Sequence, residues 1–251
     1  MKNYNTNRGY VPTDMIEFSQ DNYIKLLQAR NDICYLIDRG YPIKSAAVFV
    51  GNHYLLSERQ RLALLRATST SEIIKKRKMK ENTKKKNIQK VYIDGLNLII
   101  TLEVALSGSI LINCMDGTIR DLAGLRGTYR LIDKTDLAIR LIGAELEKLQ
   151  IDTACFYLDS PVSNTGRLKH RIDELLEPYH FEVEINLVNN ADVNLENKSN
   201  IITSDSIVLN KCISWINLIP EIIRENIADP FLIDLSKNRH ENSMDPDVNI
   251  I

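Results

Sequence analysis

The chain has 251 residues, of which 44% are hydrophobic and 26% charged, and this balance predicts a globular protein with a full apolar core. No apolar run approaches the roughly 20 residues of a membrane-spanning helix, and the formal net charge of -1 excludes a uniformly basic or acidic protein. Four scattered cysteines without a CxxC pair argue against a disulfide framework and a zinc site. We therefore expect a soluble, cytoplasmic protein with no membrane partner.

Residues 1–74 predict a small N-terminal helical domain. Apolar residues recur at helical spacing in three segments between residues 18 and 70, and RGYP at 39–42 separates the first two. In the third segment Ser57 precedes Gln60 by three residues, which is the pattern of a capping box. The arginines of this third helix are expected on its outer face: Arg59, Arg61 and Arg66.

A strongly basic linker, residues 75–90, follows the helices. It holds nine Lys or Arg residues against one Glu, so the rest of the chain is net acidic. Two interpretations stay open for such a run, a solvated linker or an arm that binds phosphate groups. On the second interpretation, Lys84, Lys85 and Lys86 contact a nucleic-acid backbone.

In residues 91–236 the pattern changes to apolar strands that alternate with helices. The expected strands are residues 91–93, 110–114, 154–158, 183–188, 201–203 and 231–235. The expected helices between them include residues 133–150, 167–176 and 206–216. This alternation is typical of an α/β domain, with a mainly parallel sheet and helices on both faces. A polar tail, residues 237–251, is expected to be disordered.

Carboxylates follow most of these strands. The residues concerned are Asp94, Asp116, Asp159, Asp192 and Asp205. In a parallel sheet the carboxyl ends of the strands share one edge, where ligands bind. Clustered carboxylates raise one another's pKa unless a cation compensates them, and hard oxygen ligands suit Mg²⁺ or Mn²⁺. The alternative is that each Asp caps the next helix or forms an Asx turn.

Three of these motifs carry a family resemblance. IDGLN at 93–97, NNADVNL at 189–195 and ITSDS at 202–206 resemble, in order and spacing, the acidic signatures of the NYN branch of PIN-like ribonucleases. The resemblance covers residues 90–235 and implies a PIN/NYN-like fold that cleaves RNA with Mg²⁺ or Mn²⁺. It implies metal binding by three aspartates, a role for Asn97 in holding the site or a phosphate, and support or water activation by Asp159. The metal ligands would be Asp94, Asp192 and Asp205.

The chain departs from this pattern in two places. Hydrophobic Ile207 and Val208 stand where a second acidic residue usually follows the Ser-Asp element, and residues 107–132 form a long insertion. Glu103, on the helix after the first strand, is interpreted either as a further ligand or as an exposed helix charge. Over residues 15–236 the chain also resembles an uncharacterised, largely archaeal family with a helical N-terminal domain, a resemblance that implies no activity.

Two segments offer further groups for substrate binding. The insertion carries three arginines among glycines, so guanidinium groups and backbone amides could reach phosphates beside the carboxylates; the alternative is a plain surface loop. DSPVSNTGR at 159–167 offers hydroxyl, amide and guanidinium groups at the start of a helix. The candidate substrate-binding residues are Arg120, Arg126, Arg130, Ser163, Asn164 and Arg167.

The sequence therefore predicts a metal-dependent ribonuclease with RNA as its partner. One alternative is a non-catalytic RNA-binding or assembly module with an incomplete site, which Ile207 favours. Another is a small-molecule phosphohydrolase or nucleotide-binding enzyme, in which the arginines of the insertion bind a single phosphate group. Zinc-site histidine spacing and the GxGxxG and Walker A patterns do not occur in the chain.

Overall fold

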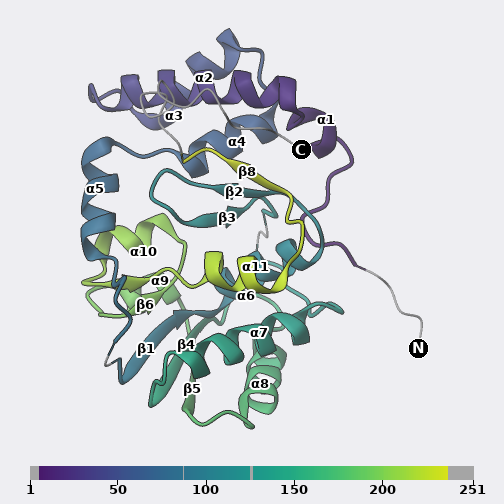
Figure 1. The fold of residues 1–251 in the computed structure, drawn as a ribbon, viewed down its shortest axis with the longest axis vertical. Helices are drawn as coiled ribbons and strands as arrows, with labels where there is room; N and C mark the ends of the chain where they lie inside the picture. Colours follow the sequence, from purple (N-terminus) through teal and green to yellow (C-terminus); the bar gives the residue numbers. More distant parts are fainter. Residues whose placement is uncertain (1–5, 87, 125–126, 237–251) are drawn as a thin grey trace.

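The computed structural model describes residues 6–86, 88–124 and 127–236, so the predicted tail at 237–251 lies outside it. Figure 1 shows three layers along the long axis of the molecule. The N-terminal helices lie at the top, a small sheet lies beneath them, and a larger sheet with its own helices lies at the bottom. Among the described residues, no helix combines the length and the apolar character that a membrane span requires.

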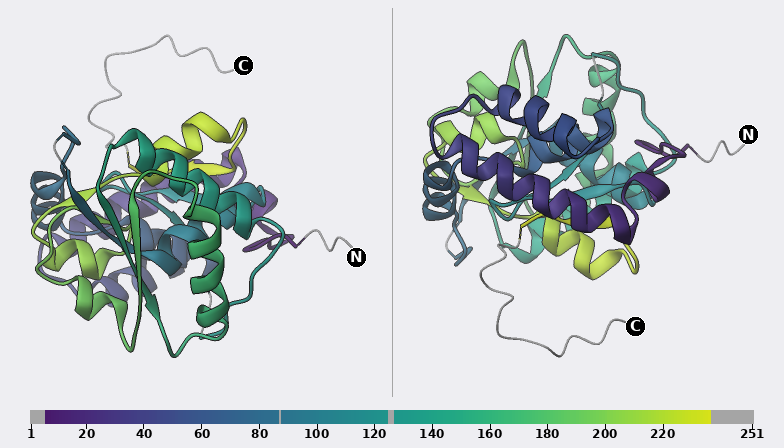
Figure 2. Two further views of the ribbon diagram at one scale, coloured as in Figure 1. Left: turned by 90° about the horizontal axis from the view of Figure 1, so that it is seen from below. Right: turned by 90° about the horizontal axis from the view of Figure 1, so that it is seen from above.

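The N-terminal helices are α1 (Asp14–Glu17), α2 (Gln20–Ile37), α3 (Ile43–His53), α4 (Glu58–Ala67) and α5 (Ser71–Lys80). The three predicted helices are confirmed as α2, α3 and α4, and α2 runs across this end of the molecule (Figure 2, right). The predicted capping box is present, since the Gln60 backbone N–H donates to Ser57 Oγ at 3.1 Å and the Ser57 N–H donates to Gln60 Oε1 at 2.9 Å. The predicted basic linker is helical over residues 75–80, which belong to α5.

The larger sheet has five parallel strands in the order β5-β4-β1-β6-β7. They are β1 (Lys90–Asp94), β4 (Thr153–Asp159), β5 (Glu182–Val188), β6 (Ile201–Ile202) and β7 (Trp215–Ile216). The first four confirm predicted strands. The prediction of one helix over 206–216 was wrong beyond Lys211, because the chain there turns into β7 and buries the Trp215 indole, whose Nε1 donates to the Arg77 carbonyl at 2.7 Å.

Helices cover both faces of this sheet, as predicted. On one face, α6 (Gly95–Leu106), α7 (Thr135–Lys148), α8 (Thr165–Leu176) and α11 (Ile219–Asn226) pack against the main apolar core. On the other face, α9 (Ala191–Leu195) and α10 (Ser206–Lys211) pack near β6 and β7. Because α9 and α10 are short, Tyr92 and Tyr157 stay partly exposed on this second face.

A second sheet, in the order β3-β2-β8, joins the two parts of the molecule. It consists of β2 (Leu111–Asn113), β3 (Ile119–Asp121) and β8 (Leu232–Asp234). The prediction that residues 110–114 and 231–235 extend the larger sheet was therefore wrong. The insertion folds back on itself as a hairpin, with Cys114 N–H donating to the Thr118 carbonyl at 2.9 Å, and β2 then pairs with β8.

Alternation along β2 explains why this sheet lies between the helices and the larger sheet. Leu111 packs into the core of the larger sheet, whereas Ile112 packs into the core of α2, α3 and α4. Ile233 on β8 also packs into the helical core. Residues 110–122 of the insertion are therefore part of the protein interior and not a surface loop, whereas Gly124, Gly127 and Arg130 are exposed.

Candidate functional site

The strand order reverses between β1 and β6, which is where ligands bind in open parallel sheets. From β1 the chain continues to β4 on one side and returns later to β6 on the other side. Asp94 and Asp159 are the last residues of β1 and β4, and Asp192 and Asp205 follow β5 and β6. The four predicted catalytic aspartates therefore stand at the same edge of the larger sheet.

Asp94 is the most deeply buried of the four, with 5% of its surface exposed. Its carboxylate accepts hydrogen bonds from Thr203 Oγ1 at 2.9 Å and from the Asn97 backbone N–H at 3.4 Å. Burial, together with the charges of Asp205 and Asp192, raises the pKa of Asp94 to about 7 against the lowering effect of the hydrogen bonds from Thr203 and Asn97. Its ionisation is therefore unfavourable without a compensating cation.

The carboxylate of Asp192, in the first turn of α9, accepts no hydrogen bond from any described residue, although the residue is partly buried. Burial, followed by the charges of Asp205 and Asp159, raises the pKa of Asp192 to about 6. Two of the four aspartates also serve local structure. Asp205 caps α10 by accepting from the N–H groups of Ile207 and Val208, and Asp159 accepts from the Ala191 N–H at 2.8 Å.

Asn97 ties together the two turns that carry Asp94 and Asp205. Its Oδ1 accepts from the Ser204 N–H at 2.8 Å and from Ser204 Oγ at 2.9 Å. Its Nδ2 donates no hydrogen bond within the described ranges. The carboxamide thus fixes the β1–α6 turn against the β6–α10 turn and leaves two N–H groups for other partners.

The aspartates lack positively charged partners. Within residues 6–86, 88–124 and 127–236, none of the four forms an ion pair, and no group of three or more His, Cys, Asp or Glu side chains is arranged to enclose a metal ion. Direct coordination in this arrangement would therefore use one or two carboxylates. Both carboxylate oxygens of Asp192, and the second oxygen of Asp205 and of Asp159, accept no hydrogen bond in the described part of the chain.

Asp116 does not join this edge, contrary to the prediction. It is 2% exposed, in the β2–β3 turn, and forms ion pairs with Arg77 at 2.7 Å and Arg120 at 2.6 Å. Burial alone would raise the pKa of Asp116, but Arg120, Thr118 and Arg77 hold it below its usual value. Because the insertion lies in the second sheet, the Asp116 carboxylate is held in the β2–β3 turn by the two arginines and stabilises that turn.

The predicted phosphate-binding arginines are dispersed. Arg120 is buried, and its nitrogens donate to Asp116, to the Ser204 carbonyl at 2.7 Å and to the Arg66 carbonyl. Arg126 lies outside the described residues. Arg130 and Arg167 are exposed.

Ser163 and Asn164 meet Arg130 at a second location, where they line a separate cavity of about 540 Å³. Both side chains donate to the Tyr129 carbonyl, at 3.1 Å and 2.6 Å. They therefore hold the segment before α7 in place and do not reach the aspartates through any contact of the described residues.

The basic run is divided between structural and exposed cations. Arg77 is 3% exposed, and Lys85 forms an ion pair with Glu221. Lys84 and Lys86 are exposed and have no partner among the described residues. Only these last two of the three predicted lysines are available for an external phosphate.

Both interpretations of Glu103 were wrong. The side chain is fully buried, pairs with Arg8 Nε at 2.5 Å and accepts from the Tyr129 hydroxyl at 2.8 Å. Burial raises the pKa of Glu103 against the lowering effect of Arg8. Glu103 links the N-terminal segment to α6 and contacts none of the four aspartates.

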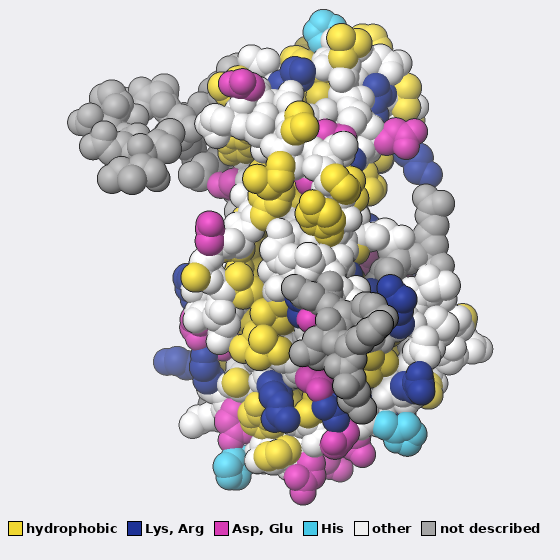
Figure 3. Space-filling model, turned by 90° about the vertical axis from the view of Figure 1, so that its right-hand side faces the viewer, with side chains coloured by type: hydrophobic (Ala, Val, Ile, Leu, Met, Phe, Trp, Pro, Cys, Tyr) yellow, Lys and Arg dark blue, Asp and Glu magenta, His cyan; other side chains and the backbone are white. Residues whose placement is uncertain are grey.

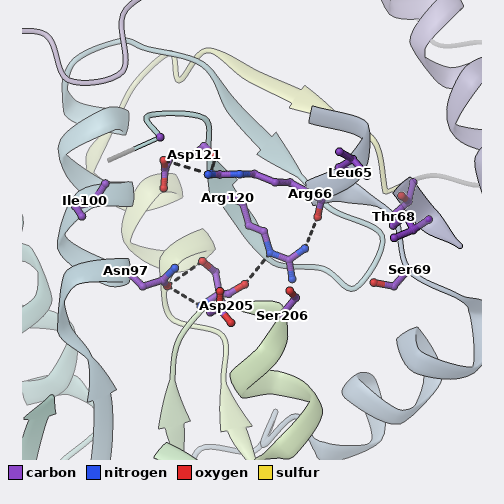
Figure 4. Close-up of a pocket in the computed structure, with 13 residues that line it drawn as sticks. Leu65, Arg66, Thr68, Ser69, Asn97, Ile100, Arg120, Asp121, Asp205 and Ser206 are labelled. Carbon is purple, nitrogen blue, oxygen red and sulfur yellow. Dashed lines mark hydrogen bonds and ion pairs between the residues drawn. The ribbon is translucent and has the colours of Figure 1, made fainter. Parts of the chain in front are cut away.

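A cavity of about 510 Å³ opens at the reversal between β1 and β6, between α4 and the β6–α10 turn (Figure 4). Asn97 and Asp205 line it, together with Arg66 and Arg120. The expectation that the α4 arginines lie on an outer face was wrong, since Arg59, Arg61 and Arg66 are partly buried and donate to protein acceptors. Sequence reasoning missed Arg66 as a site residue, because its position depends on the packing of α4 over the second sheet.

Comparison with known proteins places this fold in a family. Residues 83–221 match a domain of unknown function, DUF5616, and residues 25–80 match a protein family of unknown function, DUF434. The uncharacterized protein MJ0935 of Methanocaldococcus jannaschii is 38% identical over 184 residues, covering 72% of this chain and 88% of that protein. No solved structure matches the chain. In this chain the DUF434 match lies before the DUF5616 match, and one archaeal relative aligns with most of the chain. The chain therefore belongs to the DUF5616 family.

Proposed function

We propose that this protein is a Mg²⁺- or Mn²⁺-dependent phosphodiesterase that acts on RNA. One observation carries the proposal: Asp94, Asp192 and Asp205 come from three different parts of the chain and form no ion pair among the described residues, and the charge of Asp205 raises the pKa of both Asp94 and Asp192. Such an arrangement costs stability in the absence of a cation, which suits a site that binds one.

The oxygen donors fit a hydrated divalent cation. Mg²⁺ keeps several of its waters and is commonly held by one or two carboxylates together with substrate phosphates. Asp192 and Asp205 would hold it, and Asp94 would add negative charge to the site. A bound divalent ion supplies an activated water and stabilises the leaving oxygen of a phosphodiester.

Two surface features support RNA as the substrate. Lys84 and Lys86 are exposed, and the Tyr92 and Tyr157 rings stand 6.5 Å apart on the partly open sheet face, with Lys198 Nζ 4.6 Å from the Tyr92 centroid. Aromatic rings beside cations suit the stacking of single-stranded bases. On the side of the molecule opposite α5, acidic and basic side chains are intermingled and no broad basic face is present (Figures 1 and 3).

A second candidate, a non-catalytic RNA-binding module, is favoured by the position after Asp205. Ile207 is 51% exposed there, where the NYN-type pattern has a carboxylate. Without that oxygen the site would bind metal weakly, and RNA binding would rest on the lysines and tyrosines alone.

The experiment is a calorimetric titration of the full chain with Mn²⁺, together with an RNA cleavage assay. We expect Asp192→Asn to weaken Mn²⁺ binding at least 10-fold and to abolish cleavage, because it removes a ligand charge. Asp229→Asn, an exposed aspartate between α11 and β8, makes the same chemical change away from the site and should alter neither measurement. RNA binding without any Mn²⁺ binding in the wild type would favour the non-catalytic module.

A further inference from the structure

We propose that the cavity between α4 and the β6–α10 turn binds a single nucleotide, free or at the end of an RNA chain, and that Arg66 contacts its phosphate. The inference rests on the proposed function, because it assigns the position of the substrate beside the same carboxylate edge. It also gives the N-terminal helical region a direct part in the site.

The cavity has the size and the place of a small-molecule site. Its volume of about 510 Å³ lies within the range of roughly 300–1,000 Å³ for such sites, and it opens where the strand order reverses. Asp205 stands in its wall, so a ligand there lies next to the proposed metal. A space of this size accommodates one nucleotide and not a continuous strand.

The cavity lining offers hydrogen-bond donors that have no acceptor in the described part of the chain. Asn97 Nδ2, Arg66 Nε and Nη2, and Ser206 Oγ make no hydrogen bond with any residue that the structure describes. Arg66 Nη1 donates to the Asp121 carbonyl, which holds the guanidinium in place while its other nitrogens stay open. Unpaired donors from three elements at one cavity indicate an anionic ligand with several acceptor oxygens, as in a phosphate.

Arg66 is the arginine available for that anion. Of the two arginines in the cavity wall, Arg120 lies in the middle of the view in Figure 4, and its Nε, Nη1 and Nη2 are all engaged by protein oxygens. Asp116 offsets its charge at 2.6 Å. The nearest carboxylate oxygen to Arg66, by contrast, is Asp121 Oδ1 at 3.5 Å, a weak contact.

The lining also includes three aliphatic side chains, one each from α3, α4 and α6: Ile43, Leu65 and Ile100. A nucleotide combines a phosphate with a flat base whose faces are apolar. A lining that combines hydrogen-bond donors with aliphatic side chains therefore fits a nucleotide better than inorganic phosphate or a sugar phosphate.

The test measures binding of AMP, adenosine and inorganic phosphate to the full chain, and of RNA hexamers with a 5′-phosphate, a 3′-phosphate or neither. We expect Arg66→Ala to lower AMP affinity about 10- to 100-fold, the usual effect of removing a charge-assisted hydrogen bond, and to leave adenosine affinity unchanged. Arg140→Ala, on the exposed face of α7, is the matched control and should change neither. Equal AMP affinity in wild type and Arg66→Ala, or no nucleotide binding at all, overturns the proposal.

A second variant tests the same cavity in case Arg66→Ala does not fold. Ser206→Phe fills the cavity from the start of α10 and keeps the contact between Arg66 and Asp121, so it should abolish AMP binding with thermal unfolding unchanged; retained AMP binding would place the nucleotide elsewhere. Tighter binding of a phosphorylated hexamer than of AMP identifies an RNA end as the ligand, and equal affinity identifies a free nucleotide.

Failure of the proposed function is a separate result. Mn²⁺ affinity should be the same in Arg66→Ala and wild type, because Arg66 contacts none of the four aspartates. If the protein binds nucleotide through Arg66 but binds no Mn²⁺, the nucleotide site is supported and the phosphodiesterase proposal is contradicted. If it binds Mn²⁺ but its nucleotide binding does not depend on Arg66, the nucleotide site is contradicted and the phosphodiesterase proposal still stands.

Discussion

Asp94 illustrates how one residue can serve a site at the cost of stability. A carboxylate that is 5% exposed and lies near two others is held by only two hydrogen bonds, from Thr203 and from the Asn97 backbone. A carboxamide of the same shape would accept one of these hydrogen bonds and would carry no charge to bury. Retaining a carboxylate here is typical of positions that trade stability for function.

Asp94→Asn should therefore stabilise the metal-free protein at pH 8 more than at pH 5. The folded pKa of Asp94 is about 7 and the unfolded value about 3.9, so the proton bound in the folded state contributes stability below about pH 4, and that stability is lost as pH rises through 7. The advantage of the variant should grow by about 2 to 3 kcal/mol between pH 5 and pH 8. Urea unfolding in the presence of a chelator measures it, with Asp229→Asn as control; parallel pH profiles for Asp94→Asn and wild type would contradict the raised pKa.

At the scale of elements, α5 is fixed to the rest of the molecule mainly through Arg77. Its guanidinium pairs with Asp116 at 2.7 Å and donates to Asn210 Oδ1 at 2.8 Å, while its carbonyl accepts from Trp215. A single residue thus joins α5 to the β2–β3 turn and to α10 through its side chain, and to β7 through its backbone carbonyl. The basic character of residues 75–90 therefore has a structural component.

Arg77→Met should destabilise the protein by about 3 kcal/mol, because it removes one partner of a buried ion pair and leaves several acceptors without donors. Lys76→Met is the matched control, since the Lys76–Glu72 pair is exposed and should contribute less than about 1 kcal/mol. Thermal and urea unfolding of both variants provides the comparison. A destabilisation in Arg77→Met no larger than in Lys76→Met would show that the α5 contacts contribute little.

The elements that sequence could predict are those with local signals. Strands β1, β4, β5 and β6, helix α7 and the Ser57 capping box all follow from spacing or from adjacent residues. Strand β7 was missed because two residues carry no periodicity, and β2 and β8 were assigned to the wrong sheet because strand pairing is a long-range choice. The edge position of the aspartates followed from topology, whereas the partners of Glu103 and Asp116 lie far away in sequence and give no local signal.

At the scale of the whole molecule, the charge distribution permits a test of RNA binding that is independent of chemistry. Lys84 and Lys86 are exposed, whereas Lys85 is held by Glu221. The double variant Lys84→Ala/Lys86→Ala should weaken RNA binding and make its salt dependence shallower, by about 0.7 in log-log slope for each phosphate of a single strand that is no longer neutralised. Removing Lys25 and Lys44, which form no ion pair in the described structure, is the matched control. An unchanged slope would mark the segment as a solvated linker.

The contacts between α2 and β8 place a constraint on how the protein is made. Tyr23 donates to the Asp234 carbonyl at 2.7 Å, and Arg30 donates to the Leu235 carbonyl, 205 residues further along the chain, at 2.9 Å. At roughly 5–20 residues per second, a ribosome adds those residues in about 10–40 s. During that time α2, α3 and α4 lack the strand that completes their core. The helices that are synthesised first are therefore among the last elements to complete their packing.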